Sequence, residues 1–453
     1  MESRKTGWGV TRAVAAALLM ARFADAGAAG FGYEFTAGAG QSDNVARTED
    51  NEQDETIASG GLRLSLDERT NRVAADLVGD FAFYDYLDDT FDSELIGSFV
   101  GNSTVTLIED RLKWLVSDDF GQVLNDPLSP ATPGNREHLN YFSTGLEGAF
   151  GAGSRNELSL GVHYSLASYE ESPFDSSSIR GEAGLTRSLS GSNSLGLFLR
   201  TTVLDYDDAS VSGSSYDQDE AFLRYTATGA RTSLDADVGY TKIKPDASAS
   251  EDDFLFRLNV SRQLSTRAIA RLRAGQEFAN SAYAFSSELS GGDVGLGSNP
   301  GRQTADPFTN QYASLGLDLE GNRTALSVSG SWTKQIHHEL PIFDQTLTSL
   351  GATVRRDLGP ALRLSLTALY GEGKFEQDNV DYTELDGDLS LQWQFSRRLF
   401  VTLAYNLSSR DSDIIGGDYD ENRLWLTFGY QNGTPRSSLA RPDFTRDAGE
   451  AGN

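Results

Sequence analysis

Residue types that commonly do chemistry are scarce in this chain of 453 residues. It has no cysteine and four histidines, namely His138, His163, His337 and His338. The sequence contains no Gly-x-Ser-x-Gly nucleophile motif and no pair of histidines at metal-binding spacing. His337 and His338 are neighbours, and neighbouring residues of a strand point to opposite faces, so they are not expected to share a metal ion. We therefore predict that the protein is not an enzyme and uses no metal ion or cofactor.

The charged residues that could act on a solute occur where polar and apolar residues alternate. Alternation gives a strand one apolar and one polar face, so these charges share the polar face. In a wet interior, arginines and carboxylates most often form a salt-bridged wall. The sharper hypothesis is that they set selectivity or hold a polar or anionic polymer. The candidates are Arg200, Arg257, Arg271, Arg273, Arg355, Arg363, Asp235, Asp237, Asp386 and Asp388.

One polar segment, residues 120–136, has three prolines in a short span, which makes it stiffer than a solvated loop needs to be. A stiff loop could fold into the mouth of a barrel and narrow it. The alternative, a loop that only covers the rim, is equally open. The residues of this candidate constriction loop are Phe120, Gly121, Gln122, Asp126, Pro127, Pro130, Pro133 and Asn135.

The elements that would position these residues are strands. In the stretch 419–430, every second residue from Leu424 onward is apolar: Leu424, Leu426, Phe428 and Tyr430. The same alternation recurs at residues 157–164, 233–240, 388–395 and 399–407. One row of side chains suits hydrocarbon and the other suits water, as a membrane barrel with a wet lumen requires.

Hairpins repeat along the chain. Short turns occur near residues 67–71, 109–110, 152–154, 190–192, 228–230, 265–266, 320–322, 357–359 and 396–397, mostly about 36 to 43 residues apart, with longer polar segments between them. We predict an all-β protein, a transmembrane antiparallel up-and-down barrel of about 18 to 20 strands with short periplasmic turns and long extracellular loops. A barrel of this size leaves an aqueous channel.

Both ends of the chain are expected to lie outside the barrel. Arg4, Lys5 and Arg12 precede a short apolar run and small residues, which predicts a signal peptide at residues 1–28. The barrel is assigned to residues 29–430. The polar, proline-containing segment 431–453 is predicted to be a disordered periplasmic tail.

The net charge of −28 excludes binding to nucleic acid through a basic face, because phosphate contacts need clustered Lys and Arg. Acidic loops facing water would account for this charge. The expected location is the outer membrane of a Gram-negative bacterium. The expected partners are outer-membrane lipid, the barrel-insertion machinery, and a polysaccharide or small polar solute.

Three segments carry a family resemblance. They are residues 42–45, the loop 120–135 that runs into Asn140, and the terminal strand 419–423. In these segments the chain resembles outer-membrane beta-barrel porins often associated with exopolysaccharide or exosortase loci in proteobacteria. The resemblance covers essentially the whole mature chain. It implies a large barrel that passes or secretes exopolysaccharide, and it implies no catalytic residues.

Two functions of different classes follow. The first is a porin-like conduit for exopolysaccharide or another polar solute. The second is a surface scaffold, in which a barrel without an open pore binds partners through its acidic loops. Single-channel recording distinguishes them, since a scaffold would conduct no ions.

Overall fold

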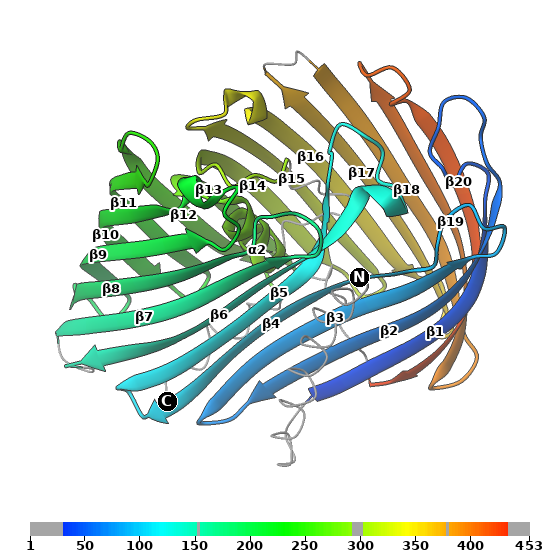
Figure 1. Ribbon diagram of the computed structural model, residues 1–453. Coiled ribbons are helices and arrows are strands. Elements are labelled where there is room, and N and C mark those ends of the chain that lie inside the picture. The colour runs from blue at the N-terminus through cyan, green and yellow to red at the C-terminus, as the bar shows by residue number, and fades with distance from the viewer. Residues whose placement is uncertain (1–29, 152–154, 292–301, 377–379, 434–453) are drawn as a thin grey trace.

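A computed structural model describes residues 30–151, 155–291, 302–376 and 380–433. Twenty strands make up most of these residues (Figure 1). They are β1 (Gly30–Ser42), β2 (Glu55–Arg69), β3 (Val73–Tyr86), β4 (Glu94–Ile108), β5 (Leu112–Leu124), β6 (Arg136–Phe150), β7 (Asn156–Tyr169), β8 (Ser176–Ser188), β9 (Asn193–Tyr206), β10 (Tyr216–Thr228), β11 (Thr232–Pro245), β12 (Glu251–Ser265), β13 (Ala268–Ala279), β14 (Phe308–Glu320), β15 (Thr324–His337), β16 (Gln345–Asp357), β17 (Leu362–Phe375), β18 (Val380–Gln394), β19 (Leu399–Ser412) and β20 (Tyr419–Asn432).

The sheet closes on itself. Each strand pairs antiparallel with its neighbour in sequence, and β1 pairs with β20, where Phe35 lies opposite Tyr430. The rings of Tyr33 and Tyr430 are 6.3 Å apart across this seam. The predicted strand count, fold class and role of the last strand are therefore confirmed: the protein is a closed barrel of 20 antiparallel strands.

The apolar row of each strand faces outward. Val162 is 61% exposed and Leu199 58%, although both lie in the middle of their strands. Because paired residues share a face, the register joins these rows into a belt. One such row runs from Leu199 through Ala221 and Tyr240 to Phe254 on four consecutive strands. An apolar belt around a closed sheet is what hydrocarbon requires, since closure pairs every backbone group.

The two ends of the barrel differ in their connections. Turns of two to five residues join the strands at one end, where β1 begins and β20 finishes. At the other end the connections contain from four residues to the 28 residues between β13 and β14. We refer to these as the short-turn end and the long-loop end. No helix among the described residues is long and apolar enough to cross a membrane.

The connection between β13 and β14 contains a helix, α2 (Ser281–Gly291), which lies inside the barrel (Figure 1). From the sequence, residues 286–304 are expected to form a polar connection. Asn280 caps the helix by accepting a hydrogen bond from the Tyr283 backbone N–H at 2.8 Å. Ala282, Phe285 and Leu289 follow at helical spacing. This cap and spacing are the signal that could have identified the helix.

The β5–β6 hairpin also departs from the simple barrel. Beyond the pair Phe99 and Phe120, β5 no longer pairs with β4, yet it continues to pair with β6 as far as Leu124 and Arg136. The prediction that Phe120, Gly121 and Gln122 belong to a loop is wrong. They belong to β5 because their backbones pair with β6, and the loop itself spans residues 125–135.

The predicted signal peptide falls outside the described residues, as does nearly all of the predicted tail. Strand β20 continues to Asn432, two residues beyond the expected barrel end.

Candidate functional site: the lumen and its internal plug

Helix α2 is held against β5, β6 and β7 by an apolar cluster within the barrel. The buried residues of this cluster are Val123, Leu139, Ala167, Tyr169, Ala282 and Phe285. The Phe285 ring lies so close to Gly121 that a Cβ there would be 3.1 Å from it, which explains the glycine. Beside this contact, Ser286 Oγ donates a hydrogen bond to Asp119 at 2.5 Å.

The other side of α2 contacts arginines on the barrel wall. Arg273 of β13 donates to the backbone oxygen of Ser287 at 3.0 Å, and the Arg180 guanidinium lies 5.8 Å from the centre of the Tyr283 ring. The charge of Glu277 and burial raise the pKa of the Tyr283 hydroxyl above its usual value. The helix thus bridges the lumen between β5–β7 and β13.

The loop 125–135, which we call the lumenal loop, is braced internally. Asn135 Nδ2 donates to the backbone oxygens of Asp126, Ser129 and Pro130 at 2.7, 3.2 and 3.1 Å. The Asp126 backbone N–H donates in return to Asn135 Oδ1 at 2.8 Å. Together with its three prolines, these bonds make the loop a stiff unit.

Arg410 of β19 anchors the lumenal loop from across the barrel. Its guanidinium donates to the backbone oxygens of Pro127, Leu128 and Ser129 at 3.0, 2.9 and 3.3 Å. It also forms an ion pair with Glu384 at 2.8 Å, and its side chain is fully buried. The loop therefore reaches a part of the wall that lies six strands from β5 in the closed sheet. That the loop limits permeation stays a prediction.

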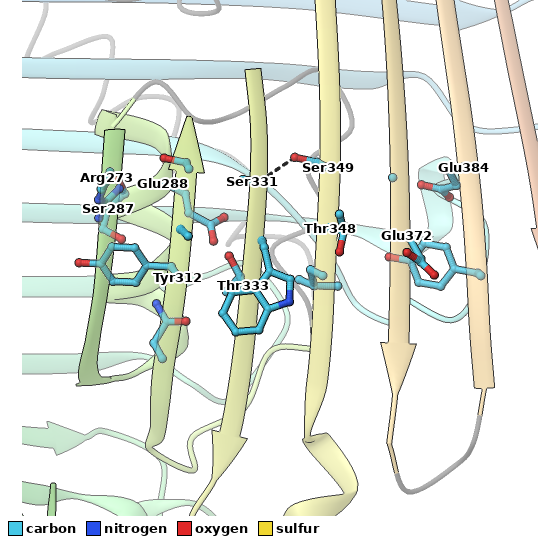
Figure 2. A pocket seen from close by; sticks show the side chains of 17 residues that line it. Arg273, Ser287, Glu288, Tyr312, Ser331, Thr333, Thr348, Ser349, Glu372 and Glu384 are labelled. Carbon is cyan, nitrogen blue, oxygen red and sulfur yellow. Dashed lines mark hydrogen bonds between the residues drawn. The ribbon is translucent and has the colours of Figure 1, made fainter. Parts of the chain in front are cut away.

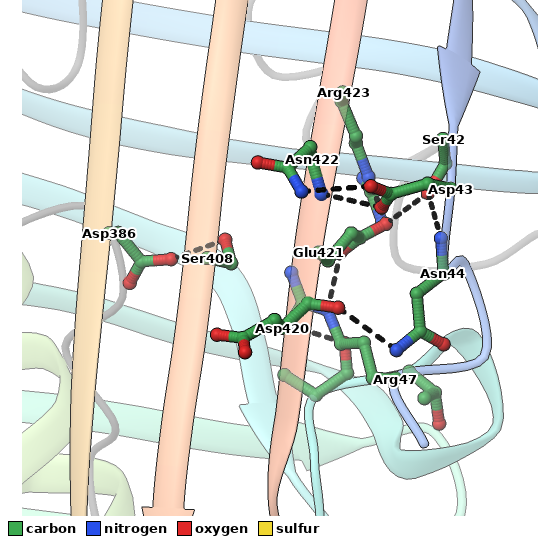
Figure 3. A network of polar contacts seen from close by, with 12 residues as sticks. Ser42, Asp43, Asn44, Arg47, Asp386, Ser408, Asp420, Glu421, Asn422 and Arg423 are labelled. Carbon is green, nitrogen blue, oxygen red and sulfur yellow. Dashed lines mark hydrogen bonds and ion pairs between the residues drawn. The ribbon is translucent and has the colours of Figure 1, made fainter. Parts of the chain in front are cut away.

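A second anchor comes from the connection between β1 and β2. Arg47 donates to the Ala131 backbone oxygen at 3.2 Å and forms an ion pair with Glu421 of β20 at 2.9 Å (Figure 3). Burial lowers the pKa of the Arg47 guanidinium, but Tyr419 and Glu421 more than offset this, so its pKa is raised above the usual value. We call the lumenal loop and α2 together the lumenal plug.

The network around Glu421 also fastens the first connection to the last strand (Figure 3). Ser42 Oγ donates to Glu421 at 2.6 Å, and Arg423 pairs with the same carboxylate. Asn422 Nδ2 donates to Asp43 at 2.8 Å. These bonds reinforce the barrel seam at its long-loop end.

Several predicted selectivity residues lie in a salt-bridged ladder on the lumen wall. Arg200 pairs with Glu182 at 2.6 Å and Glu220 at 2.9 Å, and Arg257 pairs with Glu220 at 2.7 Å and Glu277 at 2.6 Å. The ladder therefore runs from β8 to β13. Next to it, Asp237 accepts from Arg224 at 2.8 Å. Here the arginines and acids are partners within the wall.

The remaining candidates lie elsewhere on the lumen face. Arg271 pairs with Asp318, and Arg363 pairs with Asp357 at 2.8 Å near the short-turn end, where Arg355 lies on the same face. Asp235 accepts from Thr226 at 3.0 Å. Asp386 accepts from Ser408 at 2.6 Å and Asp388 from Asn406 at 2.8 Å. The structure thus does not bring these residues into one ring.

Hydroxyl side chains dominate the wall between the charged regions. One register row passes from Arg273 through Ser314, Ser331, Ser349 and Gly371 to Glu384 (Figure 2). Ser331 and Ser349 are hydrogen-bonded at 2.7 Å. We call the small residues of this surface the hydroxyl wall, which comprises Ser314, Ser327, Ser331, Ser349, Thr353 and Thr367.

A pocket separates the hydroxyl wall from α2. Its lining includes Ser287 and Glu288 on the helix and Ser331, Ser349 and Tyr312 on the wall (Figure 2). Small side chains on β14–β17 therefore leave a polar pocket beside the plug. This wall is not predicted from the sequence, because serine and threonine do not stand out by type. Their repeated occurrence on the polar face of successive strands was the available signal.

No group of three or more His, Cys, Asp or Glu in the described ranges is arranged to hold a metal ion. His337 lies near Asp344, and His338 pairs with Glu251.

A closed sheet with an apolar exterior and a polar lumen defines a membrane-spanning β-barrel of the outer-membrane type. Residues 344–432 match the family model described as "Putative beta-barrel porin 2". The porin resemblance noted in the sequence is thus confirmed over these residues, while the association with exopolysaccharide loci stays a prediction. No curated protein sequence matches the chain.

Solved structures that resemble the chain include two receptors and one transporter. The ferric enterobactin receptor (PfeA) of Pseudomonas aeruginosa, in complex with BCV-L6, is 10% identical, with 90% of this chain and 82% of that chain covered and a TM-score of 0.44. The siderophore receptor PirA of Acinetobacter baumannii is 9% identical, with 90% and 81% covered and a TM-score of 0.43. The FrpB iron transporter of Neisseria meningitidis is 9% identical, with 89% and 81% covered and a TM-score of 0.43. No inference about function follows from similarity at this level.

Proposed function

We propose that the protein is a porin-like conduit in the outer membrane of a Gram-negative bacterium, through which a polysaccharide or small polar solute crosses. The observation that carries this proposal is the pocket between α2 and the hydroxyl wall. Hydroxyl groups both donate and accept hydrogen bonds, so the wall can exchange partners with a passing hydrated solute. The arginines of the salt-bridged ladder are occupied by acids, which favours an uncharged solute over an ion.

The lumenal plug supports a second candidate, a barrel without an open pore that serves as a scaffold. Arg410 and Arg273 of the wall and Arg47 of the β1–β2 connection fasten the plug at three points. A plug held in this way could close the lumen completely.

Swelling of liposomes that contain the refolded protein distinguishes the two functions. A conduit makes liposomes swell in solutions of uncharged mono- and oligosaccharides, at rates that fall with solute size. Empty liposomes are the control. A scaffold gives no swelling above this control with any solute, and that result would contradict the proposal.

A further inference from the structure

A second cavity lies beside the lumenal loop, between the end of the β5–β6 hairpin and the wall formed by β17–β20. It has a volume of about 430 Å³ and is lined by Ala131 of the loop, by Arg47, and by residues of β3, β5, β6 and β17–β20. This volume is in the range of sites for small organic molecules, roughly 300 to 1,000 Å³. The residues that decide its chemistry are Arg136, Asp386, Asp388, Asn406, Arg423 and Trp425.

One side of the cavity is acidic. Asp386 and Asp388 occupy successive lumen positions of β18, and each accepts a hydrogen bond from β19, from Ser408 and Asn406 respectively. Neither forms an ion pair with any residue that the structure describes. An ionised carboxylate has about four acceptor positions, so both retain capacity for a ligand.

The adjoining part of the lining is basic, since Arg423 lies in the same register row as Asp388, with Asn406 between them. Arg423 and Arg47 share the single carboxylate of Glu421, which leaves that group of three with one excess positive charge. Arg136 forms an ion pair with Glu94 at 3.0 Å and also lines the cavity. A ligand that enters thus meets hydrogen-bond acceptors on β18 and donors on β6 and β20.

An aromatic surface completes the cavity. The Trp425 indole lies across Gly40 of the next strand, where a Cβ would be 2.5 Å from the indole Cδ2. Gly40 therefore lets the indole lie flat along the wall, and its ring reaches to 5.7 Å from that of Tyr84 on β3. Both rings line the cavity. A flat indole is a surface on which the apolar face of a pyranose ring can stack.

We infer that this cavity is a binding site for an uncharged sugar unit of an oligosaccharide. A hydroxyl group donates to a carboxylate and accepts from a guanidinium at the same time, so it satisfies both sides of the cavity. An anionic sugar would face Asp386 and Asp388, and a cationic one would face Arg136, Arg423 and Arg47. This inference names the class of solute for the proposed conduit. It rests on the proposed function in one respect, namely that the solute can enter the lumen.

Tryptophan fluorescence of the full-length protein in detergent micelles tests the site without requiring conduction. Of the tryptophans that the structure describes, Trp425 is on a lumen-facing row, and Trp114, Trp332 and Trp393 are exposed on the outer face. The ligands are maltohexaose, cellohexaose and hexa-N-acetylchitohexaose as uncharged hexamers, with hexagalacturonate and chitosan hexamer as charged ones. At least one uncharged hexamer is expected to change the fluorescence saturably, and Trp425→Phe is expected to remove this signal.

The variant that tests the site combines Asp386→Ala and Asp388→Ala. The matched control is Glu157→Ala, which removes a lumen-facing carboxylate of β7 away from the cavity. The double variant should weaken binding at least tenfold, and the control should leave Kd within twofold. If the double variant fails to fold, as judged by heat-modifiable migration on gels, Asn406→Ala provides the same test. No binding of any uncharged hexamer, tighter binding of a charged hexamer, or an unchanged Kd in the site variant would overturn the inference.

Conduction separates this inference from the proposed function. Binding without liposome swelling would reject the conduit and keep the site. Swelling without binding would keep the conduit and reject the site.

Discussion

At the residue scale, the lumen is governed by arginines whose partners differ in kind. Arg200 and Arg257 bind carboxylates within the wall, whereas Arg410 and Arg47 bind backbone oxygens of the lumenal loop. The alternation of polar and apolar residues predicts that the wall arginines face the lumen. It cannot predict their partners, because the partner depends on the register between strands, which a one-residue slip changes. Arg410 was missed because nothing in its own strand distinguishes an arginine that reaches a distant loop.

Replacing Arg410 is expected to free the lumenal loop. Arg410→Ala removes three hydrogen bonds from a charged donor, each of which contributes about 1.5 to 3 kcal/mol. Hydrogen exchange of the amides of residues 125–135 should therefore accelerate at least tenfold, and channel conductance should rise. Arg398→Ala, at the short-turn end, is the control. Unchanged exchange in Arg410→Ala would show that other contacts hold the loop.

Glu220 should be the most costly acid to remove from the ladder. Its side chain is 2% exposed and accepts from both Arg200 and Arg257, whose side chains are 14% exposed, so Glu220→Ala removes one carboxylate partner from each of two largely covered guanidinium groups. The expected loss is about 3 to 5 kcal/mol of unfolding free energy in lipid vesicles. In contrast, Asp357→Ala breaks the exposed pair with Arg363 and should cost under about 1 kcal/mol. Equal costs for the two variants would contradict a structural role for the ladder.

At the element scale, strands and turns follow from periodicity, but the contents of the lumen do not. Alternation predicts the hairpins, and the prolines of the lumenal loop indicate its stiffness. Helix α2 lies in the longest connection, in a region rich in serine, alanine and glycine that resembles a solvated loop. The helix is stabilised by Val123, Leu139 and Tyr169 of distant strands, and these contacts exist only once the barrel has closed.

The packing of α2 against the barrel wall can be tested at Phe285. Phe285→Ala removes a buried ring from the cluster with Leu139 and Tyr169, a change that commonly costs about 3 to 5 kcal/mol. Because the strands do not depend on the helix, the barrel should still fold while α2 detaches. Hydrogen exchange within residues 281–291 should then rise at least a hundredfold, with strand amides unaffected. Ser287→Ala, which leaves the backbone oxygen bound by Arg273, is the control. If the amides of α2 stayed protected from hydrogen exchange in Phe285→Ala, the polar contacts alone would be enough to hold the helix.

At the scale of the whole molecule, the barrel is organised by a single distinction between an apolar exterior and a polar lumen. This distinction can be predicted from the sequence, because successive side chains of a strand point to opposite faces of the sheet. Whether the lumen is open cannot be predicted from the sequence, since this depends on how much of the lumen the loop 125–135 and α2 fill. The structure holds α2 between β5–β7 and β13 and the loop against β19, and it leaves the hydroxyl wall facing a pocket.

Two adjacent residues of β17 test which face of the barrel meets lipid and which meets the lumen. Leu366 is 48% exposed on the outer face, and Thr367 belongs to the hydroxyl wall. Leu366→Arg should destabilise the protein by about 2 to 4 kcal/mol in lipid vesicles, the cost of arginine near the bilayer midplane. Thr367→Arg should fold with little loss because its guanidinium reaches water in the lumen. If both variants were equally stable, the assignment of the faces would be wrong.

The most direct test of the conduit is single-channel recording in planar bilayers of the wild type, Ser349→Trp and Leu350→Trp. The first change places an indole on the hydroxyl wall opposite α2, and the second places the same side chain on the neighbouring outward position, where Leu350 is 56% exposed. We predict that the wild type and Leu350→Trp conduct equally and that Ser349→Trp conducts less than half as much. No conductance in the wild type, or equal conductance in all three proteins, would contradict a passage between the plug and the hydroxyl wall.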